Sequence, residues 1–218
     1  MECCEVARVG KAAPVFTADG FDAVNGSFEK YSLDKYKGKY VVLFFYPGDF
    51  TFVCPTELVS LASLKEEFAE AGAQVFAVST DSKFSHKAWD ESELSKANGA
   101  PFPFPMLADR LGKIGAPYGI FDSEAGVDIR GVVIIDKEGA VQHIGINAGP
   151  LGRNPKEVLR ITLALKEHTE SGGKAIPACW IPGGETIEAK IENSGKMWNN
   201  YQAVIQKGIV QGGNWRVN

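Results

Sequence analysis

One apolar run, Tyr40–Tyr46, constrains the fold of this 218-residue chain more than any other feature. Its β-branched and aromatic side chains show no polar alternation, which is typical of a strand covered on both faces. Pro47 and Gly48 break the run, and from Cys54 apolar residues recur at helical spacing as far as Gly72. The sequence therefore predicts a buried central strand that turns sharply into a helix.

Strand and helix patterns alternate along the rest of the chain, which predicts an α/β domain with a mixed sheet. The expected elements are a strand at 74–79, a helix at 82–97, a loop at 99–105, a hairpin of 130–136 and 140–146, and a helix at 154–169. Apolar residues become sparse after Ser171-Gly172-Gly173. We therefore expect a domain over residues 1–170 and a C-terminal arm over residues 171–218 that lies against its own or a partner's surface.

Charge and hydropathy exclude two classes of function. Lys and Arg total 23 against 27 Asp and Glu, and this net charge of −4 argues against a nucleic-acid-binding domain. The strongly apolar runs are far shorter than the roughly 18 residues of a membrane-spanning helix. Residues 1–10 carry no apolar signal segment, so a cytoplasmic location is expected.

Neither the cysteines nor the histidines are spaced as metal ligands. In a reducing compartment the four cysteines are expected to be thiols rather than a disulfide framework: Cys3, Cys4, Cys54 and Cys179. The histidines are far apart and are expected on the surface or on a helix face: His86, His143 and His168. We therefore predict no metal site.

Cys54 is the candidate nucleophile because it begins the predicted helix. Free backbone N–H groups and the positive end of the helix dipole favour a thiolate at such a position. Thr51 is close enough in sequence to direct its hydroxyl at the sulfur, and Pro47 could shield the site from water. The segment Thr51–Cys54 has the spacing of a C-x-x-C motif without its first cysteine, which argues against a thioredoxin-type disulfide oxidoreductase. The alternative is an inert, buried core cysteine.

The segment FFYPGDFTFVCPTEL, Phe44–Leu58, resembles the active-site segment of the peroxiredoxins. It contains P-x-x-x-T-x-x-C, and the typical two-Cys group, which includes the peroxidase component of bacterial alkyl hydroperoxide reductase, is the most similar. Further matches extend along nearly the whole chain: Ala7–Ala18, Val78–Trp89, Pro105–Asp109, Arg130–Gly139 and Pro177–Ile187.

The resemblance implies a thioredoxin-like fold and a cofactor-free, thiol-dependent peroxidase. Cys54 matches the cysteine that attacks the peroxide and becomes sulfenic acid. Thr51 matches the residue that hydrogen-bonds the peroxide, and Pro47 matches the residue that closes the pocket. Arg130 matches the arginine that holds the thiolate, and Glu57 matches a polar partner of that arginine. The substrates implied are hydrogen peroxide and small organic hydroperoxides.

The C-terminal arm departs from the family pattern at the resolving cysteine. In the typical group the arm has the pattern V-C-P-A-x-W, whereas here Ile176 occupies the cysteine position and Cys179 directly precedes Trp180. Three extended residues span roughly 10 Å, and a disulfide needs Cα atoms within roughly 7 Å. Cys179 is the expected resolving cysteine after a larger rearrangement. A one-Cys cycle reduced by an external thiol, or resolution by Cys3 or Cys4, are the alternatives.

The resemblance also implies partners and a regulatory property. We expect a thioredoxin-like protein or a flavoprotein reductase as reductant, and a homodimer that assembles into a decamer of five dimers. The G-G-L-G loop and the C-terminal Y-F motif of oxidation-sensitive members are absent, which predicts resistance to sulfinic acid formation. A ring-shaped holdase or a peroxide-signal relay is the non-enzymatic alternative.

Overall fold

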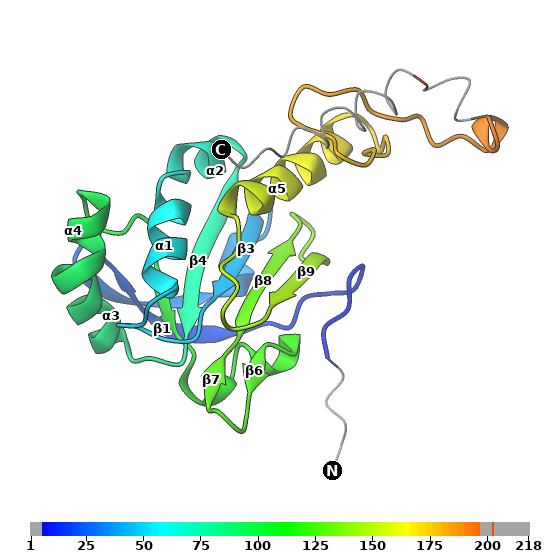
Figure 1. Cartoon of the computed structure of the whole chain (residues 1–218). Helices are drawn as coiled ribbons and strands as arrows, with labels where there is room; N and C mark the ends of the chain where they lie inside the picture. Colours follow the sequence, from blue (N-terminus) through cyan, green and yellow to red (C-terminus); the bar gives the residue numbers. More distant parts are fainter. Residues whose placement is uncertain (1–5, 197–201, 203–218) are drawn as a thin grey trace, which may run out of the picture. The chain divides into compact units, whose positions relative to one another are not determined.

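The strand predicted from the apolar run is β3, Tyr40–Phe45, inside a seven-stranded mixed sheet (Figure 1). The structure is a computed structural model and describes residues 6–196 and 202. The chain divides into two compact units, Met1–Leu159 and Arg160–Asn218. The boundary at residue 170 between a domain and an arm stays a prediction. Cys3, Cys4, Trp198 and Trp215 lie outside the described residues.

The sheet lies in the first unit and has the strand order β2-β1-β5-β4-β3-β8-β9. Its other strands are β1 (Thr17–Asp22), β2 (Ser27–Ser32), β4 (Ala73–Ser79), β5 (Met106–Ala108), β8 (Arg130–Ile135) and β9 (Val141–Asn147). β3, β4 and β5 run parallel, whereas β8 is antiparallel to β3. A separate two-stranded ladder joins β6 (Phe121–Asp122) to β7 (Val127–Asp128). The predicted α/β architecture is confirmed.

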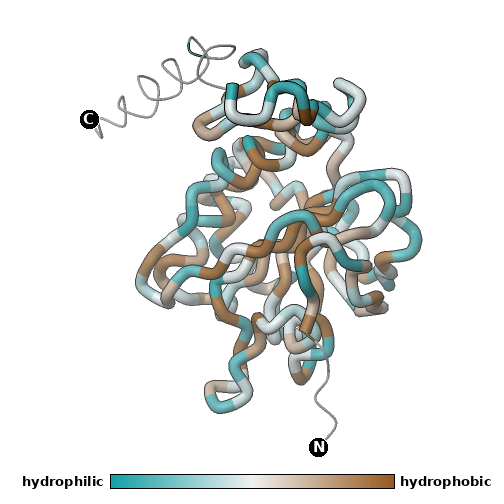
Figure 2. The backbone as a smooth tube through the Cα atoms, turned by 90° about the vertical axis from the view of Figure 1, so that its right-hand side faces the viewer, coloured by the Kyte–Doolittle hydropathy of each residue, from teal (hydrophilic) through white to brown (hydrophobic). Residues whose placement is uncertain are grey.

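The two faces of β3 enter different parts of the core, as the two-residue side-chain period of a strand requires. Val41, Leu43 and Phe45 pack with residues of the neighbouring strands and of the 114–120 segment. Every residue of β3 is buried. Figure 2 shows such apolar stretches as brown segments inside the first unit. Burial on both faces explains why the run lacks polar alternation.

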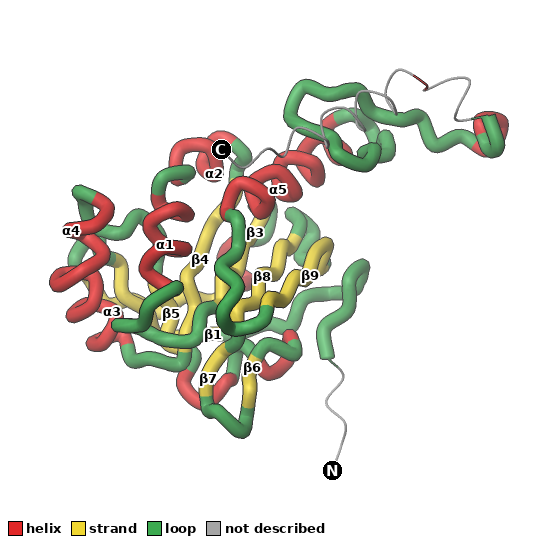
Figure 3. Tube along the Cα trace, viewed as in Figure 1, coloured by secondary structure: helices red, strands yellow, loops and turns green. Residues whose placement is uncertain are grey.

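Helices flank the strands, as the red and yellow segments of Figure 3 show. In the first unit they are α1 (Cys54–Ala62), α2 (Lys65–Glu70), α3 (Lys83–Trp89), a π-helical turn η2 (Asp90–Leu94) and α4 (Ser95–Asn98). α5 (Pro155–Glu170) begins in the first unit and continues into the second. Single 3-10 turns occur at η1 (Leu33–Tyr36), η3 (Arg110–Gly112), η4 (Ala116–Tyr118) and η5 (Ile191–Asn193). In the described part of the chain, no helix is long and apolar enough to cross a membrane.

Two predicted helices are interrupted. The helix expected from Cys54 to Gly72 breaks at Leu64, whose φ of −109° and ψ of 18° are not helical. Just before it, Ser63 Oγ donates to the carbonyl oxygen of Ser60 at 2.8 Å, a local bond that competes with helix propagation.

The helix expected at 82–97 begins as predicted, because Ser82 caps it by accepting the N–H of Ser85 at 3.1 Å. It then widens into the π-helical turn at Asp90. The buried Asp90 carboxylate accepts Ser95 Oγ at 2.7 Å and the N–H of Phe102 at 3.0 Å. The second bond ties the widened turn to the 99–105 loop.

The sequence analysis did not identify β1, β2 or β5. β5 has only three residues, and glycine, aspartate or lysine interrupts the apolar pattern of β1 and β2. Gly20 in β1 is required by close packing, since a Cβ there would lie 2.9 Å from the carbonyl oxygen of Met106. These strands depend on pairing with distant residues rather than on their own pattern.

The second unit is held by polar contacts of its own. Ala175 and Ile187 form an antiparallel bridge, with N–H to O distances of 2.8 and 2.9 Å. Trp180 is buried, and its backbone carbonyl accepts Arg160 Nη1 at 3.0 Å. The tryptophan next to Cys179 is thus a packing residue.

Candidate active site

Cys54 is the first residue of α1 and is fully buried. The turn between β3 and α1 places it at the carboxyl end of a parallel strand, where α/β folds build ligand sites. Pro55 follows in the first turn of the helix, where it is tolerated because it has no N–H to satisfy. The sequence therefore predicted both the position and the local structure of this thiol.

Arg130 joins the thiol to a carboxylate. At the start of β8, it directs Nη1 to Cys54 Sγ at 3.3 Å and to Glu57 Oε2 at 2.7 Å. Its Nε donates to the carbonyl oxygen of Gly149 at 2.6 Å. Three hydrogen bonds thus fix the guanidinium, and its positive charge lies beside the sulfur. Such a charge stabilises a thiolate over a thiol.

A second arginine, Arg153, completes the cluster, and the sequence analysis missed it. Its Nε lies 2.8 Å from Glu57 Oε1 and its Nη2 lies 3.0 Å from Oε2, so the pair is bidentate. Its backbone N–H also donates to Glu57 Oε1 at 2.7 Å. The guanidinium carbon stacks 3.5 Å from the ring centre of Phe44. A 96-residue separation from Glu57 leaves no local signal for this pairing.

The two arginines set the protonation of Glu57. Burial alone would raise the pKa of this carboxyl, but the hydrogen bonds and charge of Arg153, together with the charge of Arg130, lower the pKa below its ordinary value. Burial lowers the pKa of Arg153, because it disfavours the charged guanidinium, and the Glu57 carboxylate only partly opposes this shift. Glu57 is therefore an ionised carboxylate that orients two buried guanidinium groups.

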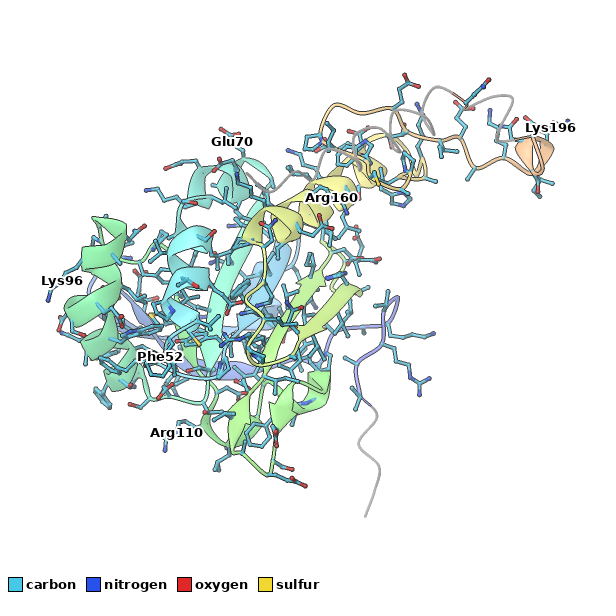
Figure 4. All side chains as sticks on the ribbon, in the orientation of Figure 1. Phe52, Glu70, Lys96, Arg110, Arg160 and Lys196 are labelled. Carbon is cyan, nitrogen blue, oxygen red and sulfur yellow. The ribbon has the colours of Figure 1, made fainter. Side chains whose placement is uncertain are left out.

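The loop before Cys54 places the other predicted residues. Thr51 Oγ1 donates its hydrogen to the carbonyl oxygen of Gly48 at 2.9 Å, which leaves its lone pairs free to accept a hydrogen bond. Pro47 is half-buried at the end of β3. Phe50 has a left-handed φ of 56°, an uncommon backbone conformation for an aromatic residue. Phe52, which Figure 4 labels, is 94% exposed.

His86 lies on a helix, one of the two placements expected, rather than on the surface. The ring is completely buried. Its Nδ1 lies 3.0 Å from an Asp49 carboxylate oxygen, and its Nε2 lies 3.2 Å from the carbonyl oxygen of Leu107. Asp49 also accepts the Tyr46 hydroxyl at 2.8 Å. The helical pattern placed His86 on α3 but did not indicate that its side chain contacts Asp49 in the loop before Cys54.

The structure brings Cys54, Arg130 and Glu57 together, with Thr51 and Pro47 on the adjoining loop. Cys179 belongs to the second unit, where it is exposed and has a left-handed φ of 58°. Within residues 6–196 and 202, no three His, Cys, Asp or Glu side chains gather in a way that could hold a metal ion. The chemistry available at this site is that of a cysteine sulfur beside a fixed guanidinium.

Comparison with known proteins agrees with this chemistry. The sequence profile of the AhpC/TSA family matches residues 9–144. Peroxiredoxin TSA1 of Saccharomyces cerevisiae is 44% identical over 189 residues, which cover 87% of this chain and 95% of the yeast protein. The chain belongs to the peroxiredoxins. Peroxiredoxin-2 of Macaca fascicularis, another member, is 40% identical over 195 residues, or 89% of this chain and 97% of that protein.

Solved peroxiredoxin structures share the fold. Reduced 2-Cys peroxiredoxin of Plasmodium vivax superposes with a TM-score of 0.79 at 36% identity, over 84% of this chain and 94% of that one. Enterococcus faecalis AhpC superposes with a TM-score of 0.72 at 32% identity, over 79% of this chain and all of that one. The expected thioredoxin-like fold is confirmed, and so is the enzyme class, since peroxiredoxins are thiol-dependent peroxidases.

Proposed function

We propose that Cys54 is the peroxidatic residue of this peroxiredoxin and acts on hydrogen peroxide and small organic hydroperoxides. The thiolate attacks one peroxide oxygen, the O–O bond breaks, and the sulfur is oxidised to sulfenic acid. The other oxygen leaves with the bonding electron pair and takes up a proton as water or an alcohol. The observation that carries this proposal is the 3.3 Å contact from Arg130 Nη1 to Cys54 Sγ.

Arg130 supports both the nucleophile and the leaving oxygen. Its Nη1 and Nε are occupied by Cys54, Glu57 and Gly149. Among the described residues no acceptor faces its Nη2, so this donor is available to a peroxide oxygen as negative charge develops. Thr51 is proposed to accept the peroxide O–H, because its own hydrogen is already donated to Gly48. Pro47 is proposed to shield this small volume from water.

Glu57 is proposed as a positioning residue rather than a proton carrier. Its lowered pKa keeps it ionised at neutral pH, so it has no proton to give. Its two oxygens instead hold Arg130 and Arg153 in fixed orientations. Preorganised donors of this kind lower a reaction barrier because they need no rearrangement as charge moves.

Cys179 is proposed to resolve the sulfenic acid. Its sulfur would attack Cys54 Sγ, form a disulfide and release water, and an external thiol would then reduce the disulfide. Its exposure supports access to this reaction. In the alternative one-Cys cycle, an external thiol attacks the sulfenic acid directly. A thioredoxin-like protein or a flavoprotein reductase is proposed as the source of electrons.

Peroxiredoxins assemble into oligomers, and we propose a homodimer that forms a decamer of five dimers. β9 is an edge strand of the sheet and therefore offers an unpaired row of backbone groups to a second chain. Exposed apolar side chains such as Phe50, Phe52 and Leu151 would gain from coverage by another subunit. A cytoplasmic location is proposed from the cysteine usage.

The test is treatment of the full chain with one equivalent of hydrogen peroxide, followed by non-reducing electrophoresis and peptide mass mapping. We expect a covalent dimer linked through Cys54 and Cys179, and no peroxide consumption by Cys54→Ser. With Cys179→Ser we expect sulfenic acid on Cys54 and no linked dimer, which is the matched control for resolution.

Other outcomes decide between the alternatives. Sulfenic acid on Cys54 with Cys179 unlinked in the unaltered chain would establish the one-Cys cycle. A link from Cys54 to Cys3 or Cys4 would move resolution to the N-terminus. An unoxidised Cys54 would overturn the proposed role of this residue altogether.

A further inference from the structure

A second cavity lies at the same edge of the sheet as Cys54 but away from the thiol. Its volume is about 390 Å³, within the range of small-molecule sites. It lies where β4 and β5 end, and both strands run parallel to β3. The carboxyl edge of parallel strands is where open α/β sheets bind ligands. None of the residues that contact Cys54 lines this cavity.

Positive charge dominates the lining. Four cationic side chains contribute, from β2, the start of α3 and the loop after β5: Lys30, Lys83, Arg110 and Lys113. Lys83 is paired with Asp19 at 3.1 Å. The other three cations have no carboxylate within ion-pairing distance in the described part of the chain.

The remaining lining acid, Asp109, does not neutralise these cations. Its carboxylate is buried and accepts the backbone N–H groups of Ile114 and Gly115, each at 2.6 Å. These bonds close the 109–115 loop into a ring around the carboxylate. As a result, Arg110 and Lys113 are both carried by backbone that a buried side chain holds in place.

Strain and close packing also fix this loop in one conformation. Leu111 has a left-handed φ of 65°. Its side chain is 80% exposed, so packing of that side chain does not explain this backbone conformation. Gly112 has a φ of 67°, and a Cβ there would lie 2.2 Å from the Phe121 ring. Backbone of this kind persists where the surroundings determine it, and it often serves a binding site. Arg110 projects from the loop toward solvent (Figure 4).

We propose that this cavity binds a small phosphorylated ligand. Three unpaired cations around one cavity match a multiply charged phosphate better than a single carboxylate. Phe84 lines the same cavity and is 64% exposed. An exposed aromatic ring beside phosphate-binding cations offers a stacking surface for the base of a nucleotide.

Calorimetric titration of the full chain with inorganic pyrophosphate, and separately with ADP, tests the proposal. We expect saturable pyrophosphate binding in wild type, weakened at least about tenfold by the double variant Arg110→Gln/Lys113→Gln, because two charge-assisted contacts are lost. Lys96→Gln is the matched control, since Lys96 is an exposed cation on α4 remote from Arg110 (Figure 4). Thermal melts of all variants verify folding.

The two probes separate the possible sources of the phosphate. ADP binding tighter than pyrophosphate, with the difference removed by Phe84→Ala, would identify a nucleotide. Equal affinities would identify a ligand recognised by its phosphates alone. Absence of saturable binding, or equal weakening by Lys96→Gln, would overturn the proposal. Cys54→Ser should bind pyrophosphate unchanged, so this result and the failure of the proposed thiol chemistry are distinguishable.

Discussion

Glu57 and Asp128 are both buried carboxyl groups, yet their surroundings drive them to opposite charge states. Two guanidinium groups contact Glu57 and lower its pKa despite burial. Within residues 6–196 and 202 no cation pairs with the buried Asp128, and burial together with the neighbouring Asp109 raises its pKa to about 9. The comparison teaches that burial alone does not set the charge of a carboxyl group here, because the paired cations outweigh it at one site and are absent at the other.

The surroundings of Asp128 satisfy the hydrogen bonding of its carboxyl group only when that group is protonated. Neither of its oxygens has a hydrogen-bond donor among the described residues. The oxygens of Asp109 are occupied by the N–H groups of Ile114 and Gly115. A Cβ on Gly115 would lie 2.3 Å from Asp128 Oδ1, so this position has no room for a side chain. A protonated Asp128 donates to Asp109, and the two residues then share one negative charge.

The two sites affect stability in opposite directions as pH changes. The lowered pKa of Glu57 contributes stability above its ordinary value of 4.5, and this contribution is lost as pH falls through the folded-state value. The raised pKa of Asp128 means that the folded state holds a proton that the unfolded state releases above about pH 3.8. Asp128 therefore costs increasing stability as pH rises toward about 9.

Removal of the Glu57 charge has the largest expected effect. Glu57→Gln leaves two buried guanidinium groups without a counter-charge, and we expect a loss of about 3–5 kcal/mol in the free energy of unfolding at pH 7. Urea denaturation followed by circular dichroism measures the loss. Glu66→Gln is the matched control, because Glu66 is exposed and forms a surface ion pair with Lys65 at 3.4 Å. Equal stability of the two variants would contradict the assignment of Glu57 as the centre of this cluster.

Substitution of the two arginines that contact Glu57 should have different effects on the rate of reaction with hydrogen peroxide. Arg130→Gln removes the contact to Cys54 Sγ, and we expect the second-order rate constant with hydrogen peroxide to fall about 10²–10³-fold. Arg153 donates no hydrogen bond to the sulfur, so Arg153→Gln should slow the reaction less while destabilising the fold. Stopped-flow tryptophan fluorescence measures both. A larger rate loss in Arg153→Gln would overturn this division of roles.

The sequence predicted those parts of the site that depend on local structure. The β3–α1 turn, Cys54 and the adjoining loop lie on consecutive residues, so an apolar run and a helix start were enough to place them. Arg130 and Glu57 were predicted from the family resemblance. In the structure Arg130 contacts both the Cys54 sulfur and the Glu57 carboxylate. Arg153 was missed because it meets Glu57 from 96 residues away.

Burial was the property that periodicity predicted least well. The helical pattern placed His86 and Phe84 on α3 correctly but did not show that His86 is completely buried or that Phe84 is largely exposed. Which side of a short helix faces the core depends on neighbouring elements, and β1 and β5, both next to α3, were not predicted. Asp128 gave no signal either, since an aspartate before a strand is an ordinary surface residue by composition.

Asp128→Asn gives the most diagnostic effect, because it appears as a dependence of stability on pH rather than as a loss at one pH. An asparagine amide donates to Asp109 at every pH, so the variant keeps the hydrogen bond and loses the titration. In wild type we expect Asp128 to remove up to about 1.4 kcal/mol of stability per pH unit as pH rises through neutrality, since only the unfolded state is then ionised there. The difference in melting temperature between variant and wild type should therefore widen in favour of the variant from pH 5 to pH 8.

Asp122→Asn, a change at an exposed turn, controls for the loss of one negative charge. A pH-independent difference, or the same slope in Asp122→Asn, would mean that Asp128 is ionised in the folded protein. Glu57 and Asp128 would then have the same charge and differ only in their contacts.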